Sequence, residues 1–161
     1  MTSSHYPAPP GAGPKVPAKG PSRIRATWAG EHRFDSGRPG GPTARIDSSG
    51  VQGQSPVDAL LTAIATCTAV DVVDILAKRR TPAEFLSVDV TGERAPAVPA
   101  RLVRLVLAYT IDGPGIDRGA AERAIDLAVT KYCSVRASLD PAIPVEFTLT
   151  LNGAATGERA D

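Results

Sequence analysis

The fold of this chain is decided by the stretch SPVDALLTAIATCTAVDVV, residues Ser55–Val73. Ser55 is followed by Pro56 and, three residues after the serine, by Asp58. A serine cap, a proline at the first helical position and an acidic residue at the third form a helix N-terminus signature, with Asp here in place of the more common Glu. We expect the helix to continue to about residue 78 or 79, where a basic cluster suits the negative end of its dipole.

The expected helix is unusually apolar. From Ala59 to Val73 only threonines and Asp71 interrupt the apolar residues. A helix that is apolar over most of its circumference is buried on more than one side. In a domain this small, the pattern predicts that a second copy of the chain covers part of the helix.

The segments around this helix alternate between apolar and polar residues, which is typical of strands. Three short strands are expected before it, at residues 23–28, 32–35 and 43–47. Two strands at 85–94 and 101–112, a second helix at 117–139 and a last strand at 145–151 are expected after it. The order βββ-α-ββ-α-β predicts an α+β domain over residues 22–152 with a mostly antiparallel sheet. The tail at residues 1–21, rich in Pro and Gly, is expected to be disordered and the tail at 153–161 flexible.

Charge and composition exclude several classes of function. The chain carries 18 Lys and Arg against 17 Asp and Glu, a net charge of +1, so we expect no nucleic-acid partner and no polybasic membrane contact. Apolar runs stay below the roughly 20 residues that span a bilayer, and the N-terminus lacks the apolar core of a signal peptide. A cytoplasmic protein without membrane attachment is therefore expected. With His5 and His32 as its histidines and no paired metal-ligand spacing, neither a metal nor a bound cofactor is expected.

Two cysteines, Cys67 and Cys133, each fall within a segment expected to be helical. A thiolate attacks peroxide oxygen readily, and a second thiol can close a disulfide on the resulting sulfenic acid. Cytosolic cysteines otherwise stay reduced, and free cysteine often serves as a small buried hydrophobe. Position alone leaves both roles open.

The residues around both cysteines resemble the OsmC/Ohr family of osmotically inducible and organic hydroperoxide resistance proteins, most closely its YhfA-like branch. The resemblance rests on the block Gly53–Val73, on the run Ala124–Ala128 and on the block Lys131–Val135. It implies an intertwined homodimer in which sheets from both chains wrap the central helices. It also implies that Cys67 reacts with an organic hydroperoxide, that Cys133 resolves the sulfenic acid, and that an external dithiol reduces the disulfide.

Activation of Cys67 is the difficult part of this comparison. The residue lies too deep in its helix for the dipole to act, since that effect fades within the first turn, and Asp71 on the same face opposes ionisation. The resemblance implies an arginine from the N-terminal strands, held by a glutamate directly after the helix proline. Arg38 is the candidate, with Arg33 and Arg45 as substitutes, but Val57 occupies the glutamate position.

Two functions follow as hypotheses. The first is a cytosolic dimeric thiol peroxidase that acts on organic hydroperoxides. The second is a dimeric protein that binds a small apolar ligand between its subunits and has cysteines that are merely oxidisable. The resemblance implies two glycines before the arginine, but here Ser36 and Gly37 precede Arg38. This incomplete motif and Val57 at the glutamate position favour the second hypothesis.

Overall fold

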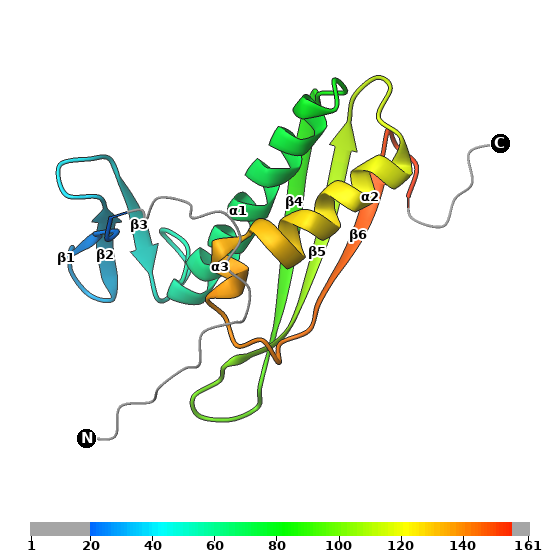
Figure 1. The fold of residues 1–161 in the computed structure, drawn as a ribbon. Coiled ribbons are helices and arrows are strands. Elements are labelled where there is room, and N and C mark those ends of the chain that lie inside the picture. The colour runs from blue at the N-terminus through cyan, green and yellow to red at the C-terminus, as the bar shows by residue number, and fades with distance from the viewer. Residues whose placement is uncertain (1–19, 156–161) are drawn as a thin grey trace.

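The chain forms two three-stranded sheets and a set of helices (Figure 1), an α+β architecture as predicted. The computed structural model describes residues 20–155, so the predicted tails lie mostly outside the described residues. The N-terminal sheet is an antiparallel meander of β1 (Arg25–Trp28), β2 (Arg33–Gly37) and β3 (Thr43–Asp47). In the second sheet β4 (Phe85–Arg94) runs antiparallel and β6 (Val145–Leu151) parallel to the central strand β5 (Leu102–Asp112).

The long helix α1 (Pro56–Lys78) begins with the expected capping box. The Asp58 N–H donates to the Ser55 hydroxyl at 3.2 Å, and the Ser55 N–H donates to the Asp58 carboxylate at 3.0 Å. One stripe of the helix is buried, at four-residue spacing: Ile64, Thr68, Val72 and Leu76. This single buried stripe leaves much of an apolar helix uncovered.

The main core lies between the second sheet and the two long helices. Helix α1 and helix α2 (Arg118–Leu127) lie on the same face of this sheet (Figure 1). Alternate residues of β5 face them and are fully buried: Leu105, Leu107, Tyr109 and Ile111. Burial of each large aliphatic side chain stabilises the fold by about 1.5–3 kcal/mol, so the packing fixes how α1 lies against α2.

The second helix is not continuous, and the prediction of one helix over residues 117–139 is wrong. It consists of α2, a π-helical turn η1 (Ala128–Tyr132) and the short helix α3 (Ser134–Ala137), with Cys133 extended between the last two. The Cys133 N–H donates to the Ala128 carbonyl at 2.9 Å, one residue further back than in an α-helix. The Thr130 hydroxyl donates to the Asp126 carbonyl at 2.7 Å, a contact that bends helices.

The meander projects from the rest of the fold and meets it where β3 leads towards α1 (Figure 1). The loop after β3 is tied by Asp47, whose carboxylate accepts from the backbone of Gln52 and from the hydroxyl and backbone of Ser49. These bonds lower the pKa of Asp47 to about 2. All four residues of strand β1 are exposed.

The chain turns back after β6. Asn152 and Gly153 adopt positive φ angles, and the Ala154 carbonyl accepts from the Leu151 N–H at 2.9 Å. The Arg118 guanidinium also donates to the Ala154 carbonyl, at 2.6 Å. The first residues of the predicted C-terminal tail are therefore anchored to the start of α2.

Candidate functional site: a cysteine pair between α1 and α3

The fold brings the two cysteines together from positions 66 residues apart, as the sequence predicted. Cys67 lies in the middle of α1 and is partly exposed, whereas Cys133 at the break before α3 is buried. The Cys133 thiol donates a hydrogen bond to the Cys67 sulfur. Both cysteines are free thiols, so the structure represents the reduced pair.

The sulfur of Cys67 is surrounded by neutral donors. Burial raises the pKa of its thiol, but the Val135 N–H, the Cys133 thiol and the Ser134 hydroxyl donate to the sulfur, and the net effect is to lower the pKa. The charge of Asp71 opposes them, as expected, although it is the smallest of these influences. Neutral groups of this chain therefore lower the pKa of Cys67 without a cation, and whether an arginine lowers it further stays a prediction.

Cys133 has the opposite character. Burial raises the pKa of its thiol to about 11, assisted by its hydrogen bond to Cys67 and by the charge that Cys67 would carry. The Arg136 N–H donates to the Cys133 sulfur at 3.3 Å and only partly offsets this. The pair therefore favours a thiolate on Cys67 and a protonated thiol on Cys133, the polarity that a nucleophile and a resolving thiol require.

A buried hydrogen bond between Tyr109 and Thr68 lies next to the cysteine pair. The Tyr109 hydroxyl donates to the Thr68 hydroxyl at 2.7 Å, and Thr68 in turn donates to the Ile64 carbonyl at 2.9 Å. Burial raises the pKa of Tyr109 to about 12, with contributions from the charges of Cys133 and Asp71. This links β5 to the helical turn that carries Cys67, a contact that sequence patterns did not indicate.

Sequence reasoning also missed Ser134 and Val135 as site residues. Both belong to the block after Tyr132 that carries the resemblance, but they were expected inside a continuous helix, where backbone N–H groups are already bonded. The interruption at Cys133 frees the first N–H groups of α3 to point at the two sulfurs. The signal was the short block itself, which places a serine directly after the cysteine.

The three candidate arginines lie on the meander and differ in their contacts. Arg45 is paired with Asp35 at 2.7 Å and Arg33 with Glu31 at 2.9 Å. The Arg38 carbonyl accepts from the Gly41 N–H at 2.9 Å, but the Arg38 guanidinium has no hydrogen-bond or ion-pair partner within residues 20–155. Arg38 lies in the turn after β2 on the sheet that projects from the rest of the fold (Figure 1), and it is not among the groups that shift the pKa of either cysteine.

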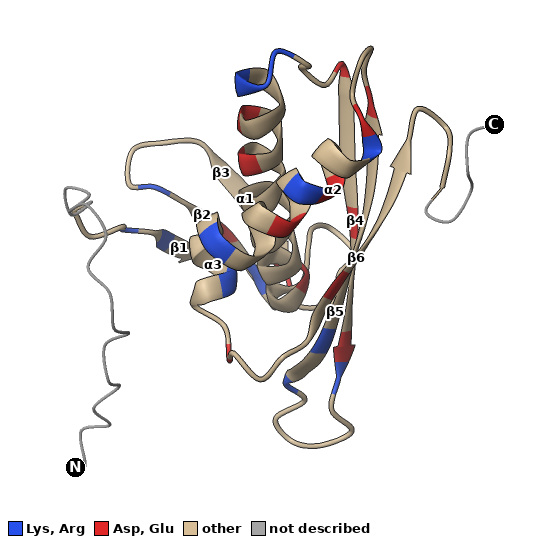
Figure 2. Cartoon of the chain, turned by 45° about the vertical axis from the view of Figure 1, so that its right-hand side comes forward, with Lys and Arg blue, Asp and Glu red and all other residues tan. Residues whose placement is uncertain are grey.

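The position of the family glutamate is filled by Val57, which packs against the hydrophobic core. Asp58, the next acidic residue, is occupied as the partner of the Ser55 cap, which lowers its pKa. Figure 2 shows acidic residues of α1 in its later turns, where Asp71 and Asp74 follow Cys67. Burial raises the pKa of Asp71, and the charge of Asp74 raises it further.

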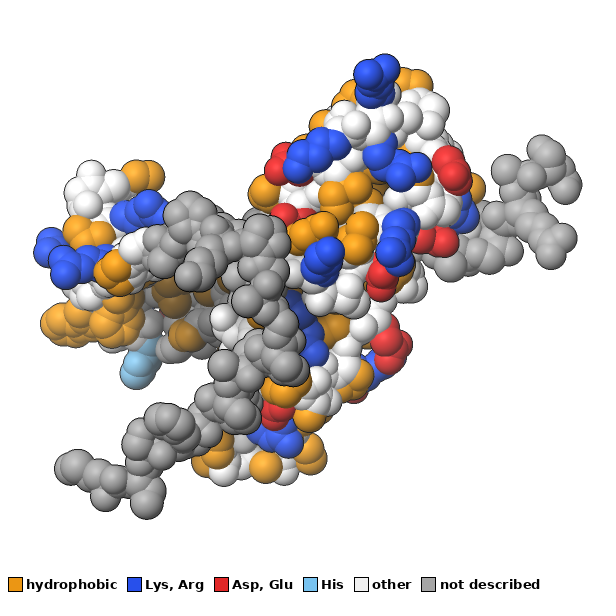
Figure 3. Space-filling view, in the orientation of Figure 1, with side chains coloured by type: hydrophobic (Ala, Val, Ile, Leu, Met, Phe, Trp, Pro, Cys, Tyr) orange, Lys and Arg blue, Asp and Glu red, His pale blue; other side chains and the backbone are white. Residues whose placement is uncertain are grey.

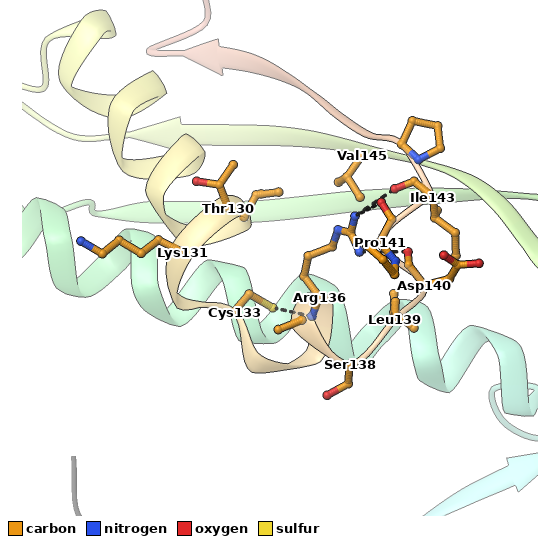
Figure 4. A pocket seen from close by; sticks show the side chains of 13 residues that line it. Thr130, Lys131, Cys133, Arg136, Ser138, Leu139, Asp140, Pro141, Ile143 and Val145 are labelled. Atoms are coloured by element: carbon orange, nitrogen blue, oxygen red, sulfur yellow. Dashed lines mark hydrogen bonds between the residues drawn. The ribbon is translucent and has the colours of Figure 1, made fainter. Parts of the chain in front are cut away.

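One cavity adjoins the site, and another lies along α1. The first, of about 930 Å³, is bounded by η1, α3 and the segment leading to β6, and Cys133 is part of its wall (Figure 4). The second, of about 480 Å³, lies on the outer face of α1, where Val70, Val73 and Phe85 line it. Among the described residues no group of three or more His, Cys, Asp or Glu side chains could hold a metal ion.

A pair of free cysteines, one partly exposed and one buried, held between a central helix and a second, interrupted helix over a mixed sheet defines a class of thiol proteins. The model of the OsmC-like protein family matches residues 48–148, and the chain belongs to this family.

The relatives agree with this assignment. Protein YhfA of Escherichia coli strain K12 is 35% identical over 98 residues, which cover 61% of this chain and 73% of YhfA. An OsmC-like protein from Mycoplasma pneumoniae shares the fold with a TM-score of 0.69 at 18% identity, over 80% of this chain and 95% of that one. The organic hydroperoxide resistance protein OhrB of Bacillus subtilis shares it with a TM-score of 0.55 at 12% identity, over 80% and 96%. At these identities the two solved structures establish the fold alone.

Proposed function

We propose that this protein is a cytoplasmic, homodimeric thiol peroxidase that reduces organic hydroperoxides with Cys67 and Cys133. The observation that carries the proposal is the polarity of the pair, with donors that favour a Cys67 thiolate and a protonated Cys133 beside it. Similarity of fold to a protein named for organic hydroperoxide resistance supports the choice of substrate class. The residues perform the chemistry without a metal or a bound cofactor.

The reaction proceeds in two steps. The Cys67 thiolate attacks the terminal oxygen of the hydroperoxide, the O–O bond breaks, and the departing alkoxide takes up a proton to become an alcohol. Cys67 is left as a sulfenic acid. Cys133 then attacks the Cys67 sulfur, and its proton leaves with the hydroxyl group as water while the disulfide forms. An external dithiol restores both thiols.

The activating cation comes, in this proposal, from a second copy of the chain. Arg38 follows β2 on the sheet that projects outwards (Figure 1), and a partner in an intertwined dimer would bring it to Cys67. A guanidinium there would stabilise the alkoxide as it leaves. Asp71, a partly buried acid one helical turn from Cys67, would hold the guanidinium in place of the absent glutamate.

The alternative is a dimeric protein that binds a small apolar ligand. Val57 at the glutamate position and the apolar cavity on the outer face of α1 favour it. In that case the cysteines would be oxidisable without being tuned for peroxides.

One experiment separates the two functions. Reduced protein is mixed with one equivalent of cumene hydroperoxide or, separately, of hydrogen peroxide, and thiol loss is followed by mass spectrometry. The peroxidase should form the Cys67–Cys133 disulfide faster with the organic hydroperoxide. Cys67→Ser should abolish the reaction, and Cys133→Ser should stop at a sulfenic acid that dimedone traps. A Cys67 that reacts no faster than free cysteine would instead support the ligand-binding protein.

A further inference from the structure

The cavity of about 930 Å³ beside Cys133 has no role in the peroxide reaction described above. Its wall is largely apolar, with Val129, Leu139, Ile143 and Val145 among the lining residues, and it also contains Cys133. Cys67 does not line it. Of the two cysteines, only Cys133 therefore faces this cavity.

The charges of this cavity favour an anion. Lys131 and Arg136 line it against one acidic residue, Asp140. The Arg136 guanidinium donates to the carbonyls of Asp140, Pro141 and Ile143, which fixes the rim, and its backbone N–H points at the Cys133 sulfur (Figure 4). Lys131 is exposed, and its ammonium lies 5.5 Å from the ring centre of Tyr132.

The oxidised pair has a preferred direction of cleavage. In thiol–disulfide exchange the sulfur that leaves fastest is the one with the lower pKa. The donors around Cys67 lower the pKa of its thiol, whereas burial raises that of Cys133. A nucleophile that attacks Cys133 therefore expels the better leaving group, and Cys133 is the sulfur in the cavity wall.

We propose that this cavity is the entry site of the electron donor, a small dithiol whose thiolate attacks the Cys133 sulfur of the Cys67–Cys133 disulfide. The inference rests on the proposed function, because it concerns the regeneration of the same pair. We assign the donor to the dithiols for two reasons. The reactive group in the cavity wall is a sulfur, and the positively charged rim attracts a thiolate. The hydroperoxide and the donor then use separate entrances.

The exchange balances as follows. The first donor thiolate forms a bond to the Cys133 sulfur while the Cys133–Cys67 bond breaks, and Cys67 leaves as a thiolate. The second donor thiol loses its proton and attacks the donor sulfur of this mixed disulfide, and Cys133 departs and takes up a proton. Two electrons and one proton pass from the donor to the protein, which then holds a Cys67 thiolate and a Cys133 thiol, and the donor leaves as a disulfide.

The side of attack can be measured directly. The disulfide is made with diamide, so that the test does not depend on peroxidase activity, and is then treated with 2-mercaptoethanol and quenched with acid within the first turnover. After alkylation, peptide mass spectrometry locates the mercaptoethanol adduct. We expect the adduct on Cys133 and the alkyl group on Cys67. An adduct predominantly on Cys67 would overturn the proposal, whereas failure of hydroperoxides to form the disulfide would refute only the proposed function.

Variants of the cavity wall test the site itself. Ala137 lines the cavity and is exposed, whereas Ala142, exposed on the neighbouring segment, does not line it. The quantity to measure is the rate at which dithiothreitol reduces the Cys67–Cys133 disulfide, divided by the rate at which the two thiols are oxidised. Ala137→Phe fills part of the cavity and should lower this ratio several-fold, whereas the control Ala142→Phe should keep the parent ratio. An unchanged ratio in Ala137→Phe would overturn the proposal.

A charge variant provides a second test that does not depend on packing. Lys131→Glu places an acid in the cavity wall and should slow reduction by dithiothreitol several-fold at low salt, with a smaller effect at high salt because the interaction is screened. The matched control is Arg123→Glu, on the exposed face of α2 and outside the cavity wall. Equal effects of the two substitutions would mean that the cavity does not receive the thiolate.

Discussion

At the scale of single residues, the reactivity of Cys67 depends on what the start of α3 offers it. The helix dipole of α1 is too distant to act, and Asp71 works against ionisation. The Val135 N–H and the Ser134 and Cys133 side chains donate to the sulfur instead. Donors to a thiolate lower its pKa because they bond more strongly to the charged form. Neutral groups of this chain therefore lower the pKa of Cys67 without any arginine.

Removal of one of these donors should weaken the nucleophile. Ser134→Ala deletes a hydroxyl that lowers the pKa of Cys67, so its pKa should rise. The thiolate fraction falls as the pH drops below the pKa, and the rate profile should therefore move to higher pH, with alkylation by iodoacetamide several-fold slower at neutral pH. Ser138→Ala is the control, because Ser138 donates to the Ser134 carbonyl and makes no contact with Cys67. Equal profiles for Ser134→Ala and the parent would contradict this account of activation.

At the scale of elements, regular periodicity was predictable and its interruption was not. The capping box at Ser55 and the alternating strands follow from local rules, and the structure confirms them. The spacing Ala121, Ile125, Ala128, Tyr132 is equally regular, yet a π-helical turn and an extended Cys133 lie within it. That break depends on tertiary contacts of α3, which no sequence period reveals. The approach of the cysteines was therefore predictable from the family resemblance, whereas the donors that tune them were not.

Arg136 is the residue that holds the interrupted segment in place. Its guanidinium donates to the carbonyls of Asp140, Pro141 and Ile143. Arg136→Ala leaves these groups without that donor and should lower the free energy of unfolding by about 1–3 kcal/mol, measured by urea denaturation. Arg123→Ala, which loses one exposed contact to Asp126, should change it by less than about 0.5 kcal/mol. A similar loss in both variants would mean that the guanidinium does not anchor this segment.

The meander is the element expected to supply the cation. Arg38→Ala should slow the reaction with cumene hydroperoxide at least several-fold, and Arg38→Lys should recover only part of the rate, because an ammonium keeps the charge without the planar fork. Arg45 is already paired with Asp35, so Arg45→Ala should leave the rate near that of the parent. If Arg45→Ala or Arg33→Ala slows the reaction while Arg38→Ala does not, Arg38 is the wrong arginine.

At the scale of the whole molecule, one chain leaves too much apolar surface uncovered. On the outer face of α1, Val70 is 60% and Val73 is 43% exposed, and on the meander Trp28 is 66% exposed. Figure 3 shows apolar side chains gathered on the projecting sheet. By length and composition α1 could even cross a membrane, a property that it shares with core helices of soluble proteins. Large exposed apolar patches are rare on monomers, and we expect a second copy of the chain to cover both surfaces.

The dimer should therefore depend on the outer face of α1. Light scattering at micromolar concentration should give about twice the 16.7 kDa mass of the chain. Val73→Asp places a charge on this face and should weaken or abolish the dimer, because a buried unpaired charge is costly. Val98→Asp, at a fully exposed position in the turn after β4, is the matched control and should leave the mass unchanged. A folded parent chain of 16.7 kDa would rule out the dimer.

If the site is shared between two chains, two inactive variants should repair each other. Cys67→Ser removes the nucleophile and Arg38→Ala the cation, so each homodimer should reduce cumene hydroperoxide slowly or not at all. In a heterodimer of the two, the Cys67 of one chain meets the Arg38 of the other, and one complete site forms. Coexpression with two different affinity tags allows the heterodimer to be isolated, and its rate per molecule should be about half that of the parent dimer if the two sites act independently. An arginine that served the cysteine of its own chain would leave this heterodimer as slow as the variants, because neither chain carries both residues.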